Sequence, residues 1–318
     1  MNERLNVHNL SAYGGTGWTP RKTTLREEMG GIWGRFGQGD EWSPLKAVLL
    51  HRPGSELNAL KDANQANMLD APAPAAARQQ HDHLAEAYQT SGVVVHYVAP
   101  EERTSPNQMF VADLMLMTPE GAVLGRPASV VRAGEERWVA RRLAELGIPI
   151  LRSIRGRGTF EGADAIWLDP QTLLLGRGLR TNAEGAAQVT AVLREMGVEV
   201  IPVDLPWGTM HLMGMLRIVD RDLAVAWPRR LAHAAVETLR ERGYAVHFVP
   251  DEPEAESGFA LNFVTLGPRR VLMPSGNPIT RAFYESVGID CVTVDIPELI
   301  KAAGSVGCLT GIIERQSV

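Results

Sequence analysis

The hydrophobic and polar positions of the chain repeat one pattern five times. In each repeat, apolar residues spaced three and four positions apart lead to a glycine, and a run rich in β-branched residues follows. The repeats span 81–98, 137–153, 186–205, 230–250 and 279–296. A glycine directly after a helix can take the left-handed conformation that ends the helix. The pattern therefore predicts five helices, each followed by a buried strand.

Shorter apolar runs between these repeats predict further strands. They occupy 47–52, 114–118, 122–125, 172–176, 216–220, 223–227, 262–267, 270–274 and 308–313. A unit of a few strands and one helix cannot bury both faces of its own sheet, whereas five units in a closed ring leave no open edge. We therefore predict an α/β fold, namely a five-bladed α/β propeller of ββαβ repeats around a pseudo-fivefold axis.

A doubly wound sheet is the structural alternative to this ring. Paired short strands between the helices favour antiparallel hairpins over single parallel crossovers, and so favour the ring. Residues 1–44 carry no clear period and are rich in Gly, Trp and Pro, which predicts an irregular N-terminal extension before a single domain at 45–318. The extension is either a packed arm or a lid over a site.

Charge and composition limit the class of partner. The formal net charge is -5, and no long basic run occurs, which argues against nucleic acid or an anionic membrane and favours a small cationic ligand. The sequence has no signal-peptide pattern and no stretch of about 18 apolar residues, so we expect a cytoplasmic protein. Cys291 and Cys308 are the only cysteines, which agrees with a reducing compartment.

Reactive side chains are expected from different repeats, because loops from every unit of a ring meet at its axis. Asp113, Glu161, His211 and Cys308 meet this expectation. Cys308 follows a small-residue loop and precedes an apolar run, so backbone N–H groups beside it can lower the pKa of its thiol. A lone cysteine is more often a small buried side chain, and only the surrounding motifs favour the chemical interpretation.

Five short motifs follow one another along the chain. They are FVAD (110–113), FEGAD (160–164), LLLGRGLRTN (173–182), MHLM (210–213) and CLTGII (308–313). Their order and spacing resemble the dimethylarginine dimethylaminohydrolases, within the pentein superfamily that also holds arginine deiminases and amidinotransferases. The match runs from about residue 45 to the end of the chain. It implies a pentein catalytic domain that acts on a guanidino group.

The resemblance also implies the roles of four residues. Cys308 is the nucleophile and His211 the general acid and base, while Asp113 and Glu161 hold the guanidinium. Carboxylates bind the planar N–H fork of a guanidinium bidentately and keep it charged. Attack by the Cys308 thiolate gives a tetrahedral intermediate, and its amine leaves once His211 protonates it. Water activated by His211 then releases a ureido product.

Two arginines and a further acid complete the site that the resemblance implies. Arg132 and Arg180 match positions that bind the substrate carboxylate, and each lies 19 residues after an acid, Asp113 or Glu161. Together the arginines favour an α-amino acid over a simple amine. Asp164 is assigned to orienting the loop through a hydrogen bond.

Two positions depart from the pattern of the family. Met213 stands where deiminases and amidinotransferases carry an acid and where dimethylarginine hydrolases carry Lys. Unmodified arginine is therefore disfavoured as substrate, and an apolar N-substituent can lie against Met213. Ala112 replaces the first acid of the F-V-E-D motif.

The sequence thus predicts a cysteine-dependent hydrolase that converts an N-substituted L-arginine to citrulline and an amine, with no metal or other cofactor. An arginine deiminase, an amidinotransferase and, in another class, a non-catalytic binding module of the same fold are the alternatives. A homo-oligomer is compatible with the sequence. His81 and His83 do not complete a metal site and are interpreted as a solvated helix start.

Overall fold

The strands of the protein form five three-stranded sheets. The computed structural model describes residues 6–316. The sheets have the strand orders β15-β1-β2, β3-β4-β5, β6-β7-β8, β9-β10-β11 and β12-β13-β14. Within each sheet, the middle strand pairs antiparallel with one neighbour and parallel with the other. Since a parallel pair needs a crossover, one helix connects the two parallel strands in every sheet.

The elements follow the predicted pattern with two differences: the strand at 165–169 was not predicted, and the strand predicted at 308–313 begins only at Gly311. The strands are β1 (Leu45–Leu50), β2 (Val94–Tyr97), β3 (Met115–Thr118), β4 (Gly121–Leu124), β5 (Ile150–Ser153), β6 (Ala165–Asp169), β7 (Thr172–Arg177), β8 (Glu199–Asp204), β9 (Leu216–Asp220), β10 (Leu223–Ala226), β11 (Ala245–Phe248), β12 (Val264–Gly267), β13 (Arg270–Pro274), β14 (Asp290–Val294) and β15 (Gly311–Arg315). The crossover helices are α1 (Pro74–Thr90), α2 (Glu136–Glu145), α3 (Ala183–Glu195), α4 (His233–Glu241) and α6 (Pro278–Ser286). The predicted ββαβ units and their five helices are confirmed.

The glycine after each crossover helix takes the predicted conformation. Each has a positive φ, between 69° and 86°, as the left-handed helix end requires. These residues are Gly92, Gly147, Gly197, Gly243 and Gly288. The end of every crossover helix could therefore be predicted from the sequence.

The prediction that the strand after each helix is buried was wrong. Val94 in β2 is 55% exposed, and Ile150 in β5 and Phe248 in β11 are also exposed. Each of these strands is the outer strand of its sheet, with one strand neighbour and a crossover helix packed against it. The first and middle strands are mostly buried, and β9 and β10 are buried throughout. The core is therefore built from the antiparallel pairs and the buried faces of the crossover helices.

The first strands of neighbouring sheets contact one another. Contacts join β15 to β3, β6 to β9, β9 to β12, and β12 to β1. The short segments that precede the first strands also meet: α8 (Val306–Leu309) contacts η5 (Val111–Leu114), η5 contacts η7 (Gly162–Asp164), and η7 contacts η8 (Leu212–Gly214). This arrangement brings together segments that are far apart in the sequence.

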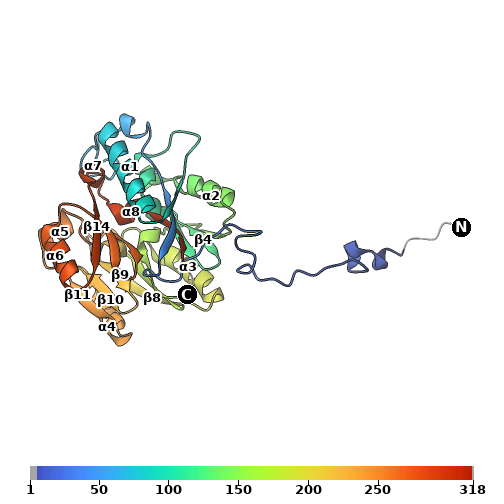
Figure 1. Ribbon diagram of the computed structural model, residues 1–318. Coiled ribbons are helices and arrows are strands. Elements are labelled where there is room, and N and C mark those ends of the chain that lie inside the picture. The colour runs from blue at the N-terminus through green and yellow to red at the C-terminus, as the bar shows by residue number, and fades with distance from the viewer. Residues whose placement is uncertain (1–5, 317–318) are drawn as a thin grey trace.

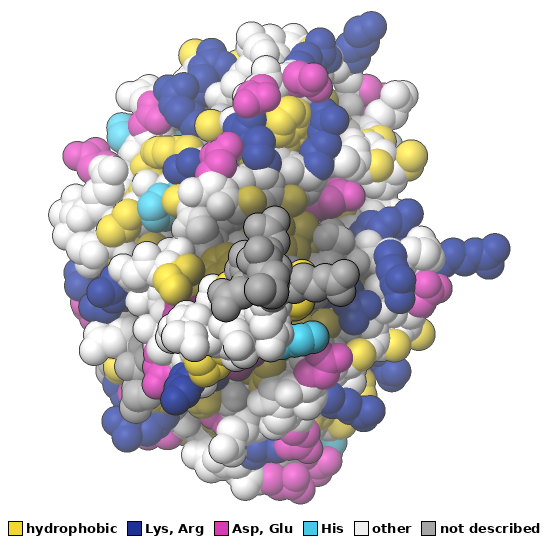
Figure 2. All heavy atoms as spheres, turned by 90° about the vertical axis from the view of Figure 1, so that its right-hand side faces the viewer, with side chains coloured by type: hydrophobic (Ala, Val, Ile, Leu, Met, Phe, Trp, Pro, Cys, Tyr) yellow, Lys and Arg dark blue, Asp and Glu magenta, His cyan; other side chains and the backbone are white. Residues whose placement is uncertain are grey.

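The chain before β1 has two parts. The short helices η1 (Val7–Asn9) and η2 (Ser11–Tyr13) stand clear of the body (Figure 1). Figure 2 looks onto the face from which this arm projects, where Lys and Arg are interspersed with Asp and Glu. Residues 34–44 pack against the body, with Phe36 buried and the Gly37 N–H donating to Ile313 O at 2.9 Å. No described residue before Leu45 lines the cavities at Cys308.

The interpretation of His81 and His83 as a solvated helix start was wrong for His81, whereas His83 is exposed as expected. Helix α1 already begins at Pro74, so His81 lies in its middle and is fully buried rather than solvated. Burial lowers the pKa of His81 to about 3, which keeps the ring neutral. Among residues 6–316, no helix combines the length and apolarity needed to cross a bilayer.

Candidate functional site

Cys308 lies in the short helix α8 and is 7% exposed. The expected strand start at Cys308 was wrong, because β15 begins only at Gly311. Burial raises the pKa of the thiol to about 11, and the charge of Asp113 acts in the same direction. This is opposite to the predicted lowering of the pKa. Without a cation beside it, Cys308 is therefore a thiol at neutral pH.

Asn262 holds Cys308 through two hydrogen bonds and was missed in the sequence. Its Nδ2 donates to Cys308 Sγ at 2.9 Å, and its Oδ1 accepts from the Cys308 N–H at 3.0 Å. A signal was available: Asn262 lies two residues before β12, as Asp113 lies two residues before β3. The repeat therefore places polar residues of different units at equivalent positions.

Two buried carboxylates face two arginines in the site. Arg132 Nη1 donates to Asp113 Oδ2 at 2.6 Å and approaches Glu161 Oε2 at 3.5 Å. Arg180 Nη1 lies 3.3 Å from Glu161 Oε2. Glu135 Oε2 fixes Arg132 from the other side, accepting from Nε at 3.0 Å and from Nη2 at 2.9 Å. The 19-residue spacing seen in the sequence thus corresponds to two ion pairs, and the acids accept guanidinium N–H groups.

His211 is bonded to one acid and close to the other. Its Nε2 lies 2.7 Å from Glu161 Oε2 and 3.8 Å from Asp113 Oδ1. Burial lowers the pKa of His211, but Asp113 and Glu161 outweigh this effect and raise it to about 9. Burial likewise raises the pKa of Glu161, but the hydrogen bond and charge of His211, together with the charges of Arg132 and Arg180, outweigh burial, so the net shift is downward. At neutral pH the pair is an imidazolium and a carboxylate.

Asp164 connects three segments of the site. Its Oδ2 accepts from Thr181 Oγ1 at 2.6 Å, and its Oδ1 accepts from the Leu212 N–H at 3.0 Å. Burial raises the pKa of Asp164 to about 6. Because Leu212 directly follows His211, these bonds orient the backbone that carries the imidazole.

Cys308 and His211 line two adjoining cavities. The first also contains Asp113, Arg132 and Arg180. The second, on the other side of Cys308, is mostly apolar. Its further lining residues are Met210, Met213, Gly214, Met215, Trp227, Ala255, Glu256, Phe259, Leu261, Asn262 and Ala303. The structure thus places Met213 beside the thiol, in the cavity away from the acids.

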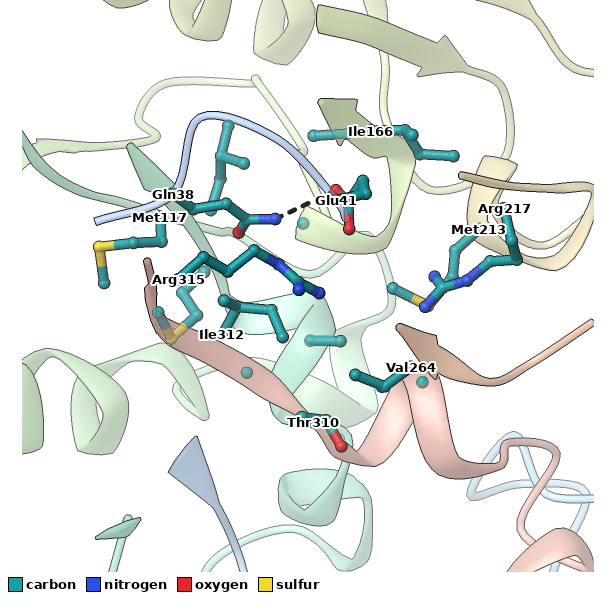
Figure 3. A pocket seen from close by; sticks show the side chains of 17 residues that line it. Gln38, Glu41, Met117, Ile166, Met213, Arg217, Val264, Thr310, Ile312 and Arg315 are labelled. Carbon is teal, nitrogen blue, oxygen red and sulfur yellow. Dashed lines mark hydrogen bonds between the residues drawn. The ribbon is translucent and has the colours of Figure 1, made fainter. Parts of the chain in front are cut away.

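A third cavity lies between the sheets and shares Met213 with the second (Figure 3). Glu41, Arg217 and Arg315 line it. Gln38 Nε2 donates to Glu41 Oε1 at 3.1 Å, as the dashed line in Figure 3 marks. Residues of the N-terminal extension therefore supply the negative charge that faces two buried arginines.

Asp113, Glu161 and His211 could in principle hold a metal ion, because one ligand atom of each lies within 4.8 Å of the others. Both carboxylates already face guanidinium groups. His211, with its pKa raised to about 9, is protonated at neutral pH and lacks the free lone pair that a metal ligand needs.

A family model described as N,N dimethylarginine dimethylhydrolase, eukaryotic, matches residues 55–314. The chain belongs to this dimethylarginine dimethylhydrolase family. It is 29% identical to an N(G),N(G)-dimethylarginine dimethylaminohydrolase of Pseudomonas aeruginosa, over 84% of this chain and 98% of the relative. An enzyme of the same name from Streptomyces coelicolor is also 29% identical, over 84% and 96% of the two chains.

Solved structures place the chain in the same dimethylarginine dimethylhydrolase family. A mutant of the Pseudomonas aeruginosa enzyme complexed with citrulline matches with a TM-score of 0.71 and 26% identity, over 84% of this chain and 98% of that chain. A dimethylarginine dimethylaminohydrolase solved as an adduct with S-methyl-L-thiocitrulline matches with a TM-score of 0.72 and 27% identity, over 84% of this chain and 98% of that chain. An amidinotransferase from Microseira wollei matches with a TM-score of 0.74 and 15% identity, over 89% of this chain and 98% of that chain. This match shows the fold alone.

Proposed function

We propose that this protein hydrolyses the guanidino group of an N-substituted L-arginine, such as a dimethylarginine, to citrulline and an amine. Cys308 is the nucleophile, His211 the general acid and base, and Asp113 and Glu161 hold the guanidinium. One observation carries the proposal: Cys308, His211 and Asp113 line a single cavity, and Glu161 is bonded to His211. The activities of the relatives named above agree with it.

Substrate binding prepares the thiol for attack. Burial keeps Cys308 protonated in the free protein, with its pKa raised to about 11. A guanidinium held by Asp113 and Glu161 brings a positive charge next to the sulfur and so stabilises the thiolate. The Asn262 Nδ2–H, 2.9 Å from Sγ, stabilises it further. The thiol proton passes to solvent, since His211 is already protonated, and substrate binding thus generates the nucleophile where it is used.

The chemistry then proceeds in two halves. The Cys308 thiolate forms a bond to the guanidino carbon, and the C–N bond to the substituted nitrogen breaks as His211 donates its proton to the departing amine. An S-alkylthiouronium remains on Cys308. Neutral His211 takes a proton from water, the hydroxide adds to the same carbon, and the C–S bond breaks. Citrulline leaves, and Cys308 is restored.

The two arginines bind the other end of the substrate in this proposal. Arg132 is fixed by Glu135, whereas Arg180 contacts Glu161 only at 3.3 to 3.4 Å. An incoming guanidinium competes for Asp113, which accepts from Arg132 Nη1 at 2.6 Å, and for Glu161. This competition frees N–H groups of both arginines for the α-carboxylate. Bidentate recognition of a carboxylate by arginine suits this role. It favours an amino acid over an amine without a carboxylate.

We also infer that the five sheets close into a five-bladed propeller around a central axis. The contacts between sheets support this, because they lead from β15 to β3, from β3 to η7 before β6, and from β6 through β9 and β12 back to β1. A cytoplasmic location, a homo-oligomer and an N-terminal extension at 1–44 that is separate from the catalytic domain at 45–318 remain predictions.

The test is product analysis with purified protein. Dimethylarginine, arginine, and arginine with glycine are supplied separately, and citrulline, dimethylamine, ammonia and new guanidino compounds are measured. Citrulline and dimethylamine in equal amounts are expected. Ammonia from arginine as the main product would assign a deiminase, and a new guanidino compound would assign a transferase.

The cysteines supply the matched control. Cys308→Ser should lower citrulline formation at least 1,000-fold, on the order expected for loss of a nucleophile. Cys291→Ser changes the other thiol, which is also buried, and should keep wild-type activity. If none of the guanidino substrates is turned over by wild-type protein, the proposed function is wrong and the non-catalytic alternative stands.

A further inference from the structure

The apolar cavity beside Cys308 is larger than the cavity that Asp113 lines. It measures about 100 Å³, against about 20 Å³ on the side of Asp113. Met210, Met213, Phe259 and Leu261 contribute hydrocarbon and thioether surface to it. Flexible methionine side chains adapt readily to the shape of an apolar group. The cavity therefore offers room that the guanidinium itself does not need.

Charged groups at this cavity are already engaged. Apart from His211, Glu256 is its one ionisable wall residue other than the thiol, and it pairs with Arg230 at 3.2 Å. Arg230 also lies over the Trp227 ring, 5.0 Å from its centroid. The wall thus presents no free charge that would select a polar or ionic ligand.

Two residues with strained backbone conformations line the same cavity. Phe259 has a φ of 52° and Ala303 a φ of 71°, in the left-handed region that residues with a Cβ rarely adopt. Both residues line the apolar cavity. Such conformations persist where surrounding structure holds them, and they cluster at binding and catalytic sites.

The geometry of a guanidinium indicates which of its three nitrogens faces this cavity. One nitrogen carries the arginine chain, which leads toward Arg132 and Arg180 in the proposed function. The carboxylates bind N–H groups on their own side, so the third nitrogen, which leaves, faces away from Asp113. His211 lines both cavities and can protonate that nitrogen. A substituent on the leaving nitrogen then enters the apolar cavity.

We propose that this cavity is a subsite for an apolar Nω-substituent larger than methyl. The inference rests on the proposed function and narrows its substrate class to Nω-alkyl- and Nω-aralkyl-arginines. The reaction consumes one water: the bond from the guanidino carbon to the substituted nitrogen breaks, a bond to oxygen forms, and citrulline and the larger primary amine are released. Met213 and Phe259 contact the substituent rather than the arginine chain.

A substrate series with wild-type protein tests this subsite. We expect kcat/KM for Nω-butyl- and Nω-benzyl-arginine to exceed that for Nω-methylarginine at least tenfold, since each further buried methylene is favourable. If Nω-methylarginine is hydrolysed and both larger substrates fall below one-tenth of its kcat/KM, or merely equal it, the subsite is refuted while the proposed function stands. If no Nω-substituted arginine yields citrulline, the proposed function itself fails.

Variants that fill the cavity give a second test. Ala255 is buried and lines it, so Ala255→Leu should lower the ratio of butyl to methyl kcat/KM about tenfold. Ala235, buried on α4 away from the site, supplies the matched control: Ala235→Leu should leave that ratio unchanged. An unchanged ratio in Ala255→Leu would contradict the inference. Should thermal melting show that this variant does not fold, Met210→Trp fills the cavity from its more exposed side and is judged by the same ratio.

Discussion

Asn262 bonds to both the thiol and the backbone of Cys308: Nδ2 lies 2.9 Å from Sγ, and Oδ1 accepts from the backbone N–H at 3.0 Å. The two residues belong to the segments before β12 and β15, so the contact connects two sheets. The side-chain bond lowers the pKa of the thiol, against the stronger effect of burial that raises it. Asn262 is therefore a positioning residue that also supports the thiolate.

Replacing Asn262 by Ala should slow alkylation of Cys308. A hydrogen bond to a charged group contributes about 1.5–3 kcal/mol, so the pKa of the thiol should rise by roughly one to two units. The rate of modification by a haloamidine should fall at least tenfold at pH 8, measured by peptide mass spectrometry across pH. Cys291 in the same protein is the internal control. Equal pH profiles for wild-type and Asn262→Ala would show that the bond does not support the thiolate.

His211 should make the stability of the protein depend on pH. Burial lowers its pKa, but Asp113 and Glu161 raise it to about 9 from the ordinary 6.5. A raised pKa in the folded state stabilises the protein below pH 6.5, and this contribution is lost as the pH rises through 9. It amounts to up to roughly 3 kcal/mol. Urea unfolding between pH 6 and 10 should show this loss in wild-type protein.

Comparing His211→Gln with His233→Gln separates the contribution of His211 to the pH dependence of stability from other contributions. His211→Gln should remove that part of the pH dependence, because the titrating group is gone. His233, which is exposed on α4, is the matched control, and His233→Gln should keep the wild-type profile. A His211→Gln variant with an unaltered slope between pH 6.5 and 9 would argue against the imidazolium.

Arg132 should stabilise the folded protein, because it neutralises two buried acids. Its guanidinium contacts Asp113 and Glu135, and all three side chains are at most 4% exposed. Removing one partner of a buried ion pair leaves an uncompensated charge and costs about 3–5 kcal/mol. Arg132→Met should lower the free energy of unfolding by this amount, as measured by urea denaturation at pH 7.

An exposed pair is the control for Arg132. Arg137 contacts Glu102 at 3.1 Å, and both side chains are at least 60% exposed. Exposed pairs contribute about 0–1 kcal/mol, so Arg137→Met should shift the unfolding midpoint little. Similar losses in the two variants would mean that the buried network adds no special stability.

Glu41 should stabilise the centre of the fold from outside the repeats. It accepts from the Trp167 N–H at 3.2 Å and opposes the charges of Arg315 and Arg217, which are both buried. Glu41→Leu removes the acceptor of the Trp167 N–H and one of the charges that oppose Arg315, and should cost about 1–3 kcal/mol. Chemical denaturation is the measurement. The exposed Glu195→Leu on α3 serves as control, and equal midpoints for the two variants would refute this role.

Local patterns in the sequence determined the repeated unit. The helical period and the glycines after it predicted five helices and their ends, since both depend on residues close together in the chain. The motifs around Asp113, Glu161, His211 and Cys308 also selected residues that the structure brings together. Recurrence of the unit, rather than any one residue, indicated that these side chains come from different sheets.

Tertiary structure decided burial and charge. Which strand of each sheet lies at its outer edge follows from how the sheets pack, so the exposure of Val94 was not visible in its own segment. The Asn262 bond to Cys308 joins residues 46 positions apart. Likewise, the raised pKa of the Cys308 thiol results from burial by distant segments. A sequence can supply the reactive groups, but their protonation depends on the solvent and charges that the folded chain places around them.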